Sequence, residues 1–454
     1  MSPTDQVLPA RTAAQIPLHR SLISRVRGLV RSSELALALI AAVVGAGAGV
    51  LVMLMSRLVQ WTHETLFGID LNQRLSGAAH LDPVAVMAWP VAGGLVVGAS
   101  LWLTQRLKRP PAVDPIEANA LHGGRMGLAD TLLVTGQVLV SNGFGASVGL
   151  EAAYTQAGSG LASWVGDRLK LRRSDLRVLV GAGAAGAIAA AFGAPLTGAF
   201  YGFEVVIGAY SVANVAPVMA AAISASLVTQ AIGGSLYHIE AETSAHITSL
   251  DYVLFTALGV VCAALAILLM RGVSILERLF KHKVVPTMVR PALGGLLLGG
   301  LALFTPQVLS AGHGALQFDL STAQSLEFIL AVLGLKMLAS AVSLGSGFRG
   351  GLFFASLLLG ALTGAVLAAS IVSGLIARET FGYSFSTFRL HLRGESIRSA
   401  HDVGWIRSLT VAVAGRVGAS RRISFPTVRE RIQPTSWALR IDSPRRCRRK
   451  VEKE

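Results

Sequence analysis

The sequence predicts an all-α membrane protein that crosses the lipid bilayer several times. Of its 454 residues, 52% are hydrophobic and only 14% are charged, and the mean hydropathy is +0.59. A soluble domain carries about 25% charged residues. Apolar runs close to the ~20 residues that a transmembrane helix needs recur up to residue 375. Two of these runs are broken by glycines, which is typical of ion sites inside membranes.

The chain is expected to divide into three parts. Residues 1–33 form a basic arm, residues 34–376 hold the apolar runs, and residues 377–454 form a basic tail without the composition of a folded domain. Segments rich in Lys and Arg stay in the cytoplasm. Both termini are therefore predicted to be cytoplasmic, with the protein in the inner membrane if the source is bacterial. A nucleic-acid partner would also suit a basic tail, but it is not expected for a polytopic membrane protein.

About ten apolar segments of unequal length are expected to build the membrane domain. In chain order they are residues 35–55, 84–105, 131–150, 152–166, 178–203, 205–237, 252–270, 292–304, 328–344 and 357–375. Several are too short to cross a hydrocarbon core of about 30 Å directly. The single charge Glu204 separates two long segments, so a boundary is predicted there, and the residue itself reads equally well as a helix-end charge or as a functional group.

One carboxylate stands out in the first half of the chain. Glu151 is the only charged residue between Thr131 and Gly166. An ionisable group at membrane depth is costly and usually has a function. Nearby glycines, Gly145 and Gly149 among them, allow the backbone to open, and N–H groups at a helix N-terminus attract anions. The Glu151 carboxylate would compete with an anion for those N–H groups.

The second half contains a similar stretch. Residues 345–356 read GSGFRGGLFFAS and run into an apolar segment, as residues 141–151 do in the first half. Corresponding breaks in two halves predict an ion site at the middle of the bilayer, built from broken helices of a repeated fold. Irregular backbone at that depth is tolerated only where protein or water covers it.

Other signals do not predict an enzyme or a cofactor. Residues 180–186 match Gly-x-Gly-x-x-Gly, but the run continues apolar without βαβ alternation, so small residues for close helix packing explain it better. Cys262 and Cys447 support neither a disulfide nor a metal site, and no nucleophile–base pair is visible. Lys336 and Arg349 each fit two interpretations, a positive charge at a pore mouth or a side chain reaching toward the membrane interface.

Four segments resemble the CLC family of chloride channels and chloride/proton exchangers. Residues 149–156 (GLEAAYTQ) resemble the family's Gly-Lys/Arg-Glu-Gly-Pro-x-x-Gln segment, and residues 191–198 (AFGAPLTG) resemble its Ala-Ala-Phe-Asn-Ala-Pro-Leu-Ala-Gly segment. Residues 345–356 resemble its Gly-x-Phe-x-Pro segment. Residues 112–121 fall where its Gly-Ser-Gly-Ile-Pro segment lies. The likeness covers about residues 34–375 and keeps the family's order.

The resemblance implies a helical bundle of inverted repeats that forms a two-fold homodimer with one chloride pore in each subunit. Glu151 falls on the family's gating glutamate, whose carboxylate occupies or vacates an outer chloride site. The backbone amides of Leu150 and Glu151 would hold chloride at that site, and those of Leu352 and Phe353 would hold it at a central site. Chloride is then the transported ion, and no further cofactor or metal is expected.

Departures from the family pattern favour passive conduction. The family's chloride-coordinating serine falls on Ala112, which has no hydroxyl. The proton-transfer glutamate of the exchangers falls on Val205, with Glu204 at the preceding position. A valine cannot carry a proton, so chloride/proton exchange would need Glu204 as a substitute.

The resemblance also implies further membrane helices that are not evident here. Residues 379–395 resemble the end of the family's last helix and the linker after it, and they follow the segment 357–375 almost at once. The hypothesis is an internal deletion, with Tyr383 or Ser386 near the position of the family's pore tyrosine. A third functional alternative follows, a non-conducting truncated subunit that dimerises with or regulates a full-length partner.

Overall fold

The computed structural model describes residues 34–70, 73–233, 249–282, 285–321 and 324–374. Within these ranges the secondary structure is helical, and strand-type pairing is limited to one isolated bridge between Gly149 and Gly351. The first half contains α2 (Glu34–Phe67), η1 (Leu75–Gly77), α3 (Pro83–Arg106), α4 (Pro115–Leu121), α5 (Leu128–Gly143), α6 (Glu151–Leu169), α7 (Arg173–Phe192), α8 (Pro195–Tyr201), η2 (Gly202–Ile207) and α9 (Val212–Gly233). The second half contains α10 (Ser249–Phe280), α11 (Arg290–Ala302), η3 (Pro306–Val308), α12 (His313–Ser321), α13 (Leu326–Ser346) and α14 (Phe353–Gly374). The predicted all-α class is confirmed.

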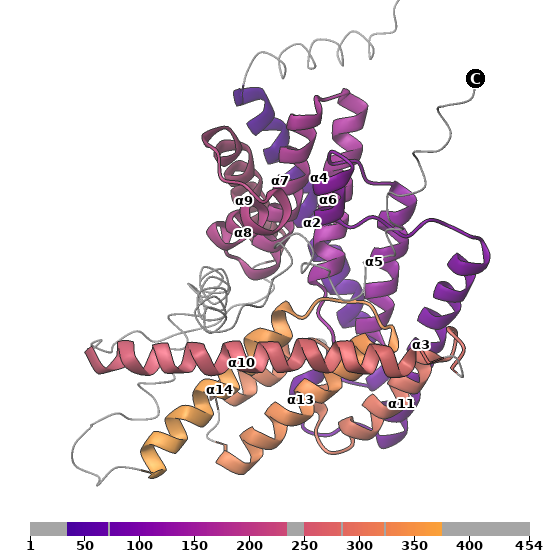
Figure 1. Cartoon of the computed structure of the whole chain (residues 1–454), viewed down its shortest axis with the longest axis vertical. Helices are drawn as coiled ribbons and strands as arrows, with labels where there is room; N and C mark the ends of the chain where they lie inside the picture. Colours follow the sequence, from indigo (N-terminus) through magenta and orange to yellow (C-terminus); the bar gives the residue numbers. More distant parts are fainter. Residues whose placement is uncertain (1–33, 71–72, 234–248, 283–284, 322–323, 375–454) are drawn as a thin grey trace, which may run out of the picture.

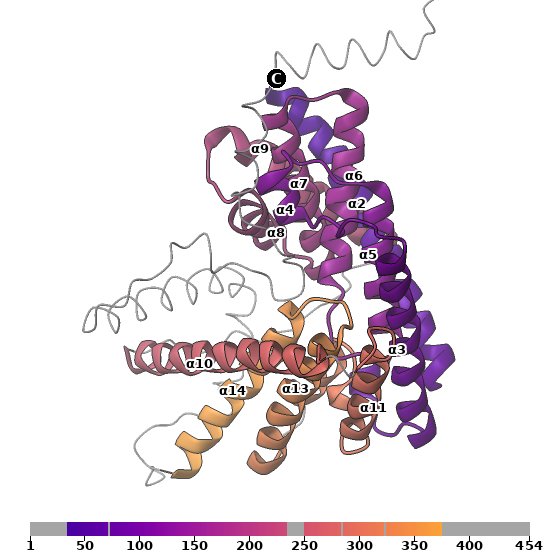
Figure 2. The ribbon, with the colours of Figure 1, turned by 45° about the vertical axis from the view of Figure 1, so that its right-hand side comes forward.

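The helices form two groups that meet near the middle of the molecule. One group gathers α2 and α6 to α9, and the other gathers α10, α11, α13 and α14, with the long α10 running across it (Figures 1 and 2). Among the described helices long enough to span a membrane, α7 is the most buried. Helix α3 leaves its own half and packs against α11 of the other.

Close contacts between helices depend on glycine. On α6 and α7, a Cβ added at Gly158 or at Gly183 would overlap the carbonyl oxygen of the other residue. On α3 and α11, a Cβ at Gly94 would meet the backbone of Pro291, and one at Gly295 would meet that of Pro90. Packing of this kind explains the glycine-rich run of α7, as predicted, because small residues let helix backbones approach closely in lipid.

The boundary predicted at Glu204 is wrong. Helix α7 already ends at Phe192, because Gly193 adopts a left-handed conformation (φ 62°) and Pro195 then starts α8 at its first turn. Glu204 lies inside η2, a π-helical turn that continues α8, and the chain breaks only at Gly208 (φ 72°). Backbone conformation, rather than the single charge, therefore divides this region.

The described part of the chain contains six helices that are long and apolar enough to cross a membrane, α2, α3, α7, α9, α10 and α13. Large apolar side chains are exposed along them, including Val43, Leu54, Val253 and Leu268. An apolar exterior of this extent suits lipid as the surrounding medium. The expectation of a multi-pass membrane protein is confirmed.

Candidate anion site at Glu151

Two loops from the two halves of the chain hold the start of α6 against the start of α14. The Gly149 N–H donates to the Gly351 carbonyl oxygen at 2.8 Å, and the Gly351 N–H donates to the Gly149 carbonyl oxygen at 3.0 Å. Both loops turn at a glycine with positive φ, Gly145 (87°) and Gly347 (111°). In each loop the glycine with positive φ precedes the bridged glycine by the same number of residues, Gly145 before Gly149 and Gly347 before Gly351. Two helix N-termini from corresponding parts of the sequence therefore meet at one place.

Serine side chains repeat this correspondence. The Ser147 N–H donates to the Ser343 Oγ at 3.1 Å, and the Arg349 N–H donates to the Ser141 Oγ at 3.0 Å. Each loop thus has one amide satisfied by a hydroxyl from the other half. This exchange is what a pseudo-two-fold axis between the loops produces, and it agrees with the predicted inverted repeat.

The Glu151 carboxylate lies between the two N-termini. Glu151 is the first residue of α6 and is 7% exposed. Its Oε1 accepts a hydrogen bond from the Phe354 N–H at 2.9 Å, and the carboxylate also lies against the backbone N–H of Glu151. Its Oε2 has no hydrogen-bond partner among the described residues. The carboxylate therefore occupies a position where helix N-termini favour negative charge.

Both glycines of the bridge make room for this carboxylate. A Cβ added at Gly149 would overlap both Glu151 oxygens, and a Cβ at Gly351 would lie 2.5 Å from Oε2. A side chain at either position would thus push the carboxylate away. The glycines that the sequence suggests for opening the backbone also form the space that the carboxylate fills.

The amides predicted to bind chloride lie close to this position. Leu150 precedes the first residue of α6, and Leu352 precedes Phe353, the first residue of α14. The first N–H groups of a helix have no partner within the helix. The amide that contacts the carboxylate, however, belongs to Phe354, which the sequence analysis did not single out. The preference of an N-cap oxygen for the second or third helical N–H could have pointed to it.

Ala112 lies beside α6, as the resemblance implies. It packs against the apolar cluster that contains Leu150 and Tyr154. The next residue, Val113, accepts a hydrogen bond at its carbonyl oxygen from the Gln156 side chain of α6 at 3.1 Å. The segment before α4 therefore runs along α6 and presents a methyl group instead of a hydroxyl.

Glu204 and Val205 are not brought into the Glu151 site. The Tyr210 hydroxyl donates to the Glu204 Oε1 at 2.7 Å, and Glu204 is exposed. Val205 is half-buried in the π-helical turn. Tyr383 and Ser386 lie outside the described residues.

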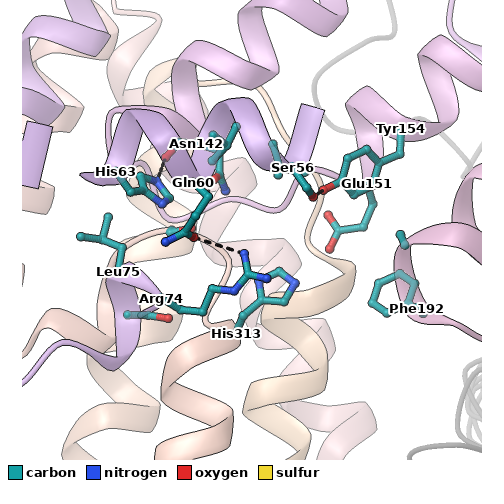
Figure 3. Close-up of a pocket in the computed structure, with 15 residues that line it drawn as sticks. Ser56, Gln60, His63, Arg74, Leu75, Asn142, Glu151, Tyr154, Phe192 and His313 are labelled. Atoms are coloured by element: carbon teal, nitrogen blue, oxygen red, sulfur yellow. Dashed lines mark hydrogen bonds between the residues drawn. The ribbon is translucent and has the colours of Figure 1, made fainter. Parts of the chain in front are cut away.

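A cavity of ≈ 40 Å³ adjoins the Glu151 carboxylate (Figure 3). By the same measure, about 10–15 Å³ is enough for one water molecule. Charged and polar residues from α2, the connection to α3, α5, α6, α12 and the loop before α12 line it, namely Ser56, Gln60, His63, Arg74, Ser76, Asn142, Glu151, Tyr154, Ser310 and His313. Arg74 donates to the Gln60 Oε1 at 3.3 Å, and the Tyr154 and Ser56 hydroxyls are hydrogen-bonded at 2.5 Å. Of the residues that line the cavity, only Leu150 and Glu151 were predicted from the sequence.

Lys336 fixes one wall of this cavity. The residue is fully buried, and its Nζ donates to the carbonyl oxygens of Ser310 at 2.7 Å and Val308 at 3.1 Å. The interpretation as a side chain reaching toward the membrane interface is wrong, because two backbone carbonyls hold the amino group inside the protein. The side chain does not line the cavity itself. Its role is to hold the chain between η3 and α12.

Asn142 links that wall to the loop before Glu151. The Ser310 hydroxyl donates to the Asn142 Oδ1 at 3.3 Å, and the His63 Nε2 is hydrogen-bonded to the Asn142 carbonyl oxygen at 2.9 Å. The Asn142 Nδ2 donates to the Val148 carbonyl oxygen at 2.5 Å. A buried polar network therefore holds the backbone just before Glu151, and such networks make a site rigid when their members are satisfied.

The chain is similar in sequence to proteins that are named as chloride channels. Residues 93–380 match the sequence profile of the voltage gated chloride channel family. Over 307 residues the chain is 29% identical to the voltage-gated ClC-type chloride channel ClcB of Escherichia coli O9:H4, which covers 66% of this chain and 73% of that protein. A ClcB-like protein of Ralstonia nicotianae is 29% identical over 285 residues, covering 61% of this chain and 65% of that protein.

The fold is shared with solved CLC structures. A CLC-type fluoride/proton antiporter superposes with a TM-score of 0.63 at 20% identity, covering 80% of this chain and 86% of that one. A slow cyanobacterial Cl⁻/H⁺ antiporter superposes with a TM-score of 0.61 at 20% identity, covering 85% and 99%. At these identities the similarity concerns the fold, and it confirms the predicted helical architecture.

Proposed function

The chain belongs to the CLC family of voltage gated chloride channels, and from this premise we propose that it conducts chloride passively through a pore that Glu151 gates. Anion transport is the activity of the family, whose members are transporters or channels rather than enzymes. The name of the Escherichia coli relative supports chloride as the ion and a channel as the mode of transport.

One observation carries the gating proposal. The Phe354 N–H, at the start of α14, donates to the Glu151 carboxylate at 2.9 Å. A halide ion would be bound by the same kind of donor at a helix N-terminus. Carboxylate and chloride therefore compete for one position, and the pore is blocked while the carboxylate holds it. The amides of Leu150, Glu151, Leu352 and Phe353 are proposed as the further chloride ligands once the carboxylate leaves.

Passive conduction is preferred to chloride/proton exchange because of the residues at the proposed internal proton position. The Val205 side chain cannot bind or release a proton, and the neighbouring Glu204 is exposed and hydrogen-bonded to Tyr210. Carboxylates that relay protons across membranes usually face the protein interior or a water-filled cavity. Exchange stays the alternative, with Glu204 as its carrier.

The assembly and orientation are part of the same proposal. We expect a homodimer with one pore in each subunit, as the family resemblance implies, and both termini in the cytoplasm because they are basic. In a bacterial source the protein would lie in the inner membrane.

Chloride efflux from liposomes tests the proposal. The purified full chain is reconstituted, and efflux is followed with a potassium ionophore present to remove the membrane voltage. Wild type should release chloride. Glu151→Gln should raise the flux by about tenfold to a hundredfold and remove its dependence on pH, because losing a charged hydrogen bond of about 1.5–3 kcal/mol frees the amide for chloride.

A matched control is Glu327→Gln. Glu327 is also acidic in the first turn of a helix, α13, but it is exposed and does not line the cavity. It should behave as wild type. No efflux above empty liposomes would favour the non-conducting subunit instead. Efflux that Glu151→Gln leaves unchanged in rate and pH profile would contradict gating by Glu151 but not conduction.

A further inference from the structure

We propose that the cavity beside Glu151 is itself a binding site for a small monovalent anion, held by Arg74, Ser76 and His313. The proposal rests on the proposed function, since the anion would be the permeating halide just before or after it passes Glu151. The position adjoins Leu150 and Glu151, which also line the cavity, but its proposed ligands are side chains from other elements and not the amides of α6 and α14.

Arg74 brings a permanent positive charge to the cavity. It lies directly before η1, in the connection between α2 and α3, and its side chain points into the cavity (Figure 3). Its guanidinium donates to the Gln60 Oε1 at 3.3 Å, and its charge acts on His63, His313 and Tyr154 around the cavity. A guanidinium has five N–H groups and no acceptor, so it suits an anion.

Ser76 adds a buried hydroxyl with a proton to donate. Its Oγ accepts hydrogen bonds from the Gly314 N–H at 3.0 Å and the Ala315 N–H at 3.3 Å, and the residue is 2% exposed. A serine oxygen has two lone pairs and one O–H. Since both lone pairs are used, the hydroxyl can only act as a further donor, and the two hydrogen bonds found for Ser76 Oγ among the described residues are both accepted ones. An anion in the cavity would be such an acceptor.

His313 connects this position to the gate. It is the first residue of α12, and its ring stacks on Phe354 with the ring centroids 3.6 Å apart and the planes at 19°. The Phe354 N–H in turn holds the Glu151 carboxylate. An ion beside His313 would therefore lie close to the Phe354 amide. The ion could bind that amide once the Glu151 carboxylate moves away.

The composition of the lining favours an anion over a cation. Among the described residues that line the cavity, the only carboxylate is Glu151, and it already points at the Phe354 amide. Arg74, Ser76 and His313 supply donors. The volume of ≈ 40 Å³ limits the ligand to a halide or an ion of similar size with a water or two.

Arg74 has a simpler alternative role, as the counter-ion of Glu151. A double-variant experiment separates the two. Chloride binding to the full chain in detergent is measured by calorimetry for wild type, Arg74→Gln, Glu151→Gln and the double variant. If Arg74 binds the ion, Arg74→Gln weakens chloride binding by about tenfold to a hundredfold in both backgrounds, as expected for a lost charged hydrogen bond. If Arg74 only neutralises Glu151, its replacement has no effect in the Glu151→Gln background, which overturns the proposal.

Arg57→Gln is the matched control. Arg57 is an exposed arginine of α2 whose side chain reaches the Ile232 carbonyl oxygen at 3.5 Å, outside the cavity. It should bind chloride as wild type does. Arg74→Lys keeps the positive charge but replaces the planar set of guanidinium N–H donors by one ammonium group. Its affinity for chloride should lie between those of Arg74→Gln and wild type.

A second measurement needs no variant. Crystals of the wild-type full chain soaked in bromide should show anomalous density in the cavity between Arg74, Ser76 and His313. Density only at the amides of α6 and α14, with none in the cavity, overturns the inference and leaves the proposed function standing. Bromide in the cavity of a protein that shows no efflux in liposomes supports the inference and contradicts the conduction on which its transport role rests.

Discussion

At the residue scale, the length of the Glu151 side chain matters as much as its charge. The carboxylate reaches across from α6 to the Phe354 N–H of α14. Glu151→Asp keeps the charge but removes one methylene, so the oxygens should fall short of that amide. The variant is expected to conduct like Glu151→Gln rather than like wild type in the liposome assay. Wild-type flux in the aspartate variant would show that charge alone, without contact to Phe354, closes the pore.

Asp319 should make the stability of the protein depend on pH. Asp319 lies on α12, which is not among the membrane-spanning candidates. Burial raises the pKa of its carboxyl from 3.8 to about 6, although a hydrogen bond from Gln307 to its Oδ1 at 3.1 Å acts in the opposite direction. The folded protein then holds this proton more tightly than the unfolded chain does. Stability is lost as pH rises from about 4 to about 6 and does not return above that range.

Replacing this aspartate removes the effect. Asp319→Asn should raise the thermal unfolding midpoint in detergent at pH 7.5 relative to wild type and change it much less at pH 4.5. The control is Asp70→Asn, since Asp70 is exposed. A difference between Asp319→Asn and wild type that is equal at both pH values would show that ionisation of Asp319 does not affect stability.

Glu151 could be identified from the sequence, but its partners could not. It is the only charge in a long apolar run, and that signal is local. Phe354 contacts the carboxylate from α14. Arg74, from the α2–α3 connection, and His313, from α12, line the adjoining cavity, so only the folded chain brings these residues together. No feature of the sequence distinguishes these three residues from other residues of the same type in their segments. Histidine and arginine near polar loops are common on surfaces, which hides them from sequence reasoning.

At the element scale, chloride flux and stability should both change when a side chain is added at a glycine of the bridge between the two loops. Gly149→Ala adds a methyl group where the Glu151 oxygens lie, so the carboxylate must leave the Phe354 amide. Chloride flux should then rise and lose its pH dependence although Glu151 is intact. The overlap should also destabilise the fold by about 1–3 kcal/mol.

Gly136→Ala provides the comparison. Gly136 lies inside α5, and a Cβ there meets nothing within 4 Å. This variant should keep wild-type flux and gain up to about 1 kcal/mol of stability from helix propensity. Wild-type gating in Gly149→Ala would mean that the carboxylate does not need the space between the bridged glycines.

Lys336 should be required for stability. Lys336→Met preserves most of the volume but leaves the carbonyl oxygens of Val308 and Ser310 without their donor. An unsatisfied buried group costs about 1–3 kcal/mol, so the thermal midpoint should fall by several degrees. Lys281→Met should cost less than about 1 kcal/mol, because the ion pair of Lys281 with Glu277 is exposed. Equal midpoints for the two variants would contradict the role of Lys336 as a clamp.

Helix existence was predictable, whereas some helix ends were not. Apolar runs indicated α2, α3, α10 and α13 because length and hydropathy are enough for a span. The end of α7 depends on the left-handed Gly193 and the start of α8 on Pro195. Both residues are turn signals that can be recognised in a sequence. The boundary was nevertheless predicted at Glu204, because Glu204 is the single charge in the apolar run. The π-helical turn that contains Glu204 has no sequence signal of this kind.

At the scale of the whole molecule, the position of Val205 predicts uncoupled transport. With the full chain in sealed liposomes, an imposed chloride gradient should not move protons uphill, because Val205 cannot be protonated and Glu204 lies outside the Glu151 cavity. The measurement is the external pH during chloride flow. Proton movement that an uncoupler abolishes would contradict passive conduction, and its loss in Glu204→Gln would then identify Glu204 as the carrier.

The repeated architecture was visible in the sequence through two glycine-broken runs. Residues 141–151 and 345–356 do meet, through Gly149 with Gly351 and through Ser141 with Arg349, and Ser343 just before the second run binds the Ser147 amide. The contact of α3 with α11 was not foreseeable, because both helices are merely apolar and glycine-rich. Which distant helices pack together depends on the shapes of their surfaces. The spacing of apolar residues along a helix does not indicate which other helix it contacts.

If Glu151 gates the pore as proposed, the Gly149–Gly351 bridge also predicts how quickly the pore responds. Two backbone hydrogen bonds join the loops that lead directly into α6 and α14, and sliding either helix would break them. Rotation about the side-chain torsions of Glu151 leaves both intact. Collective helix movements take about microseconds to milliseconds, and side-chain rotations are faster. Opening is then a one-residue event without a slow collective step, and current recorded from a single pore should flicker rapidly between levels instead of relaxing slowly after a change in chloride.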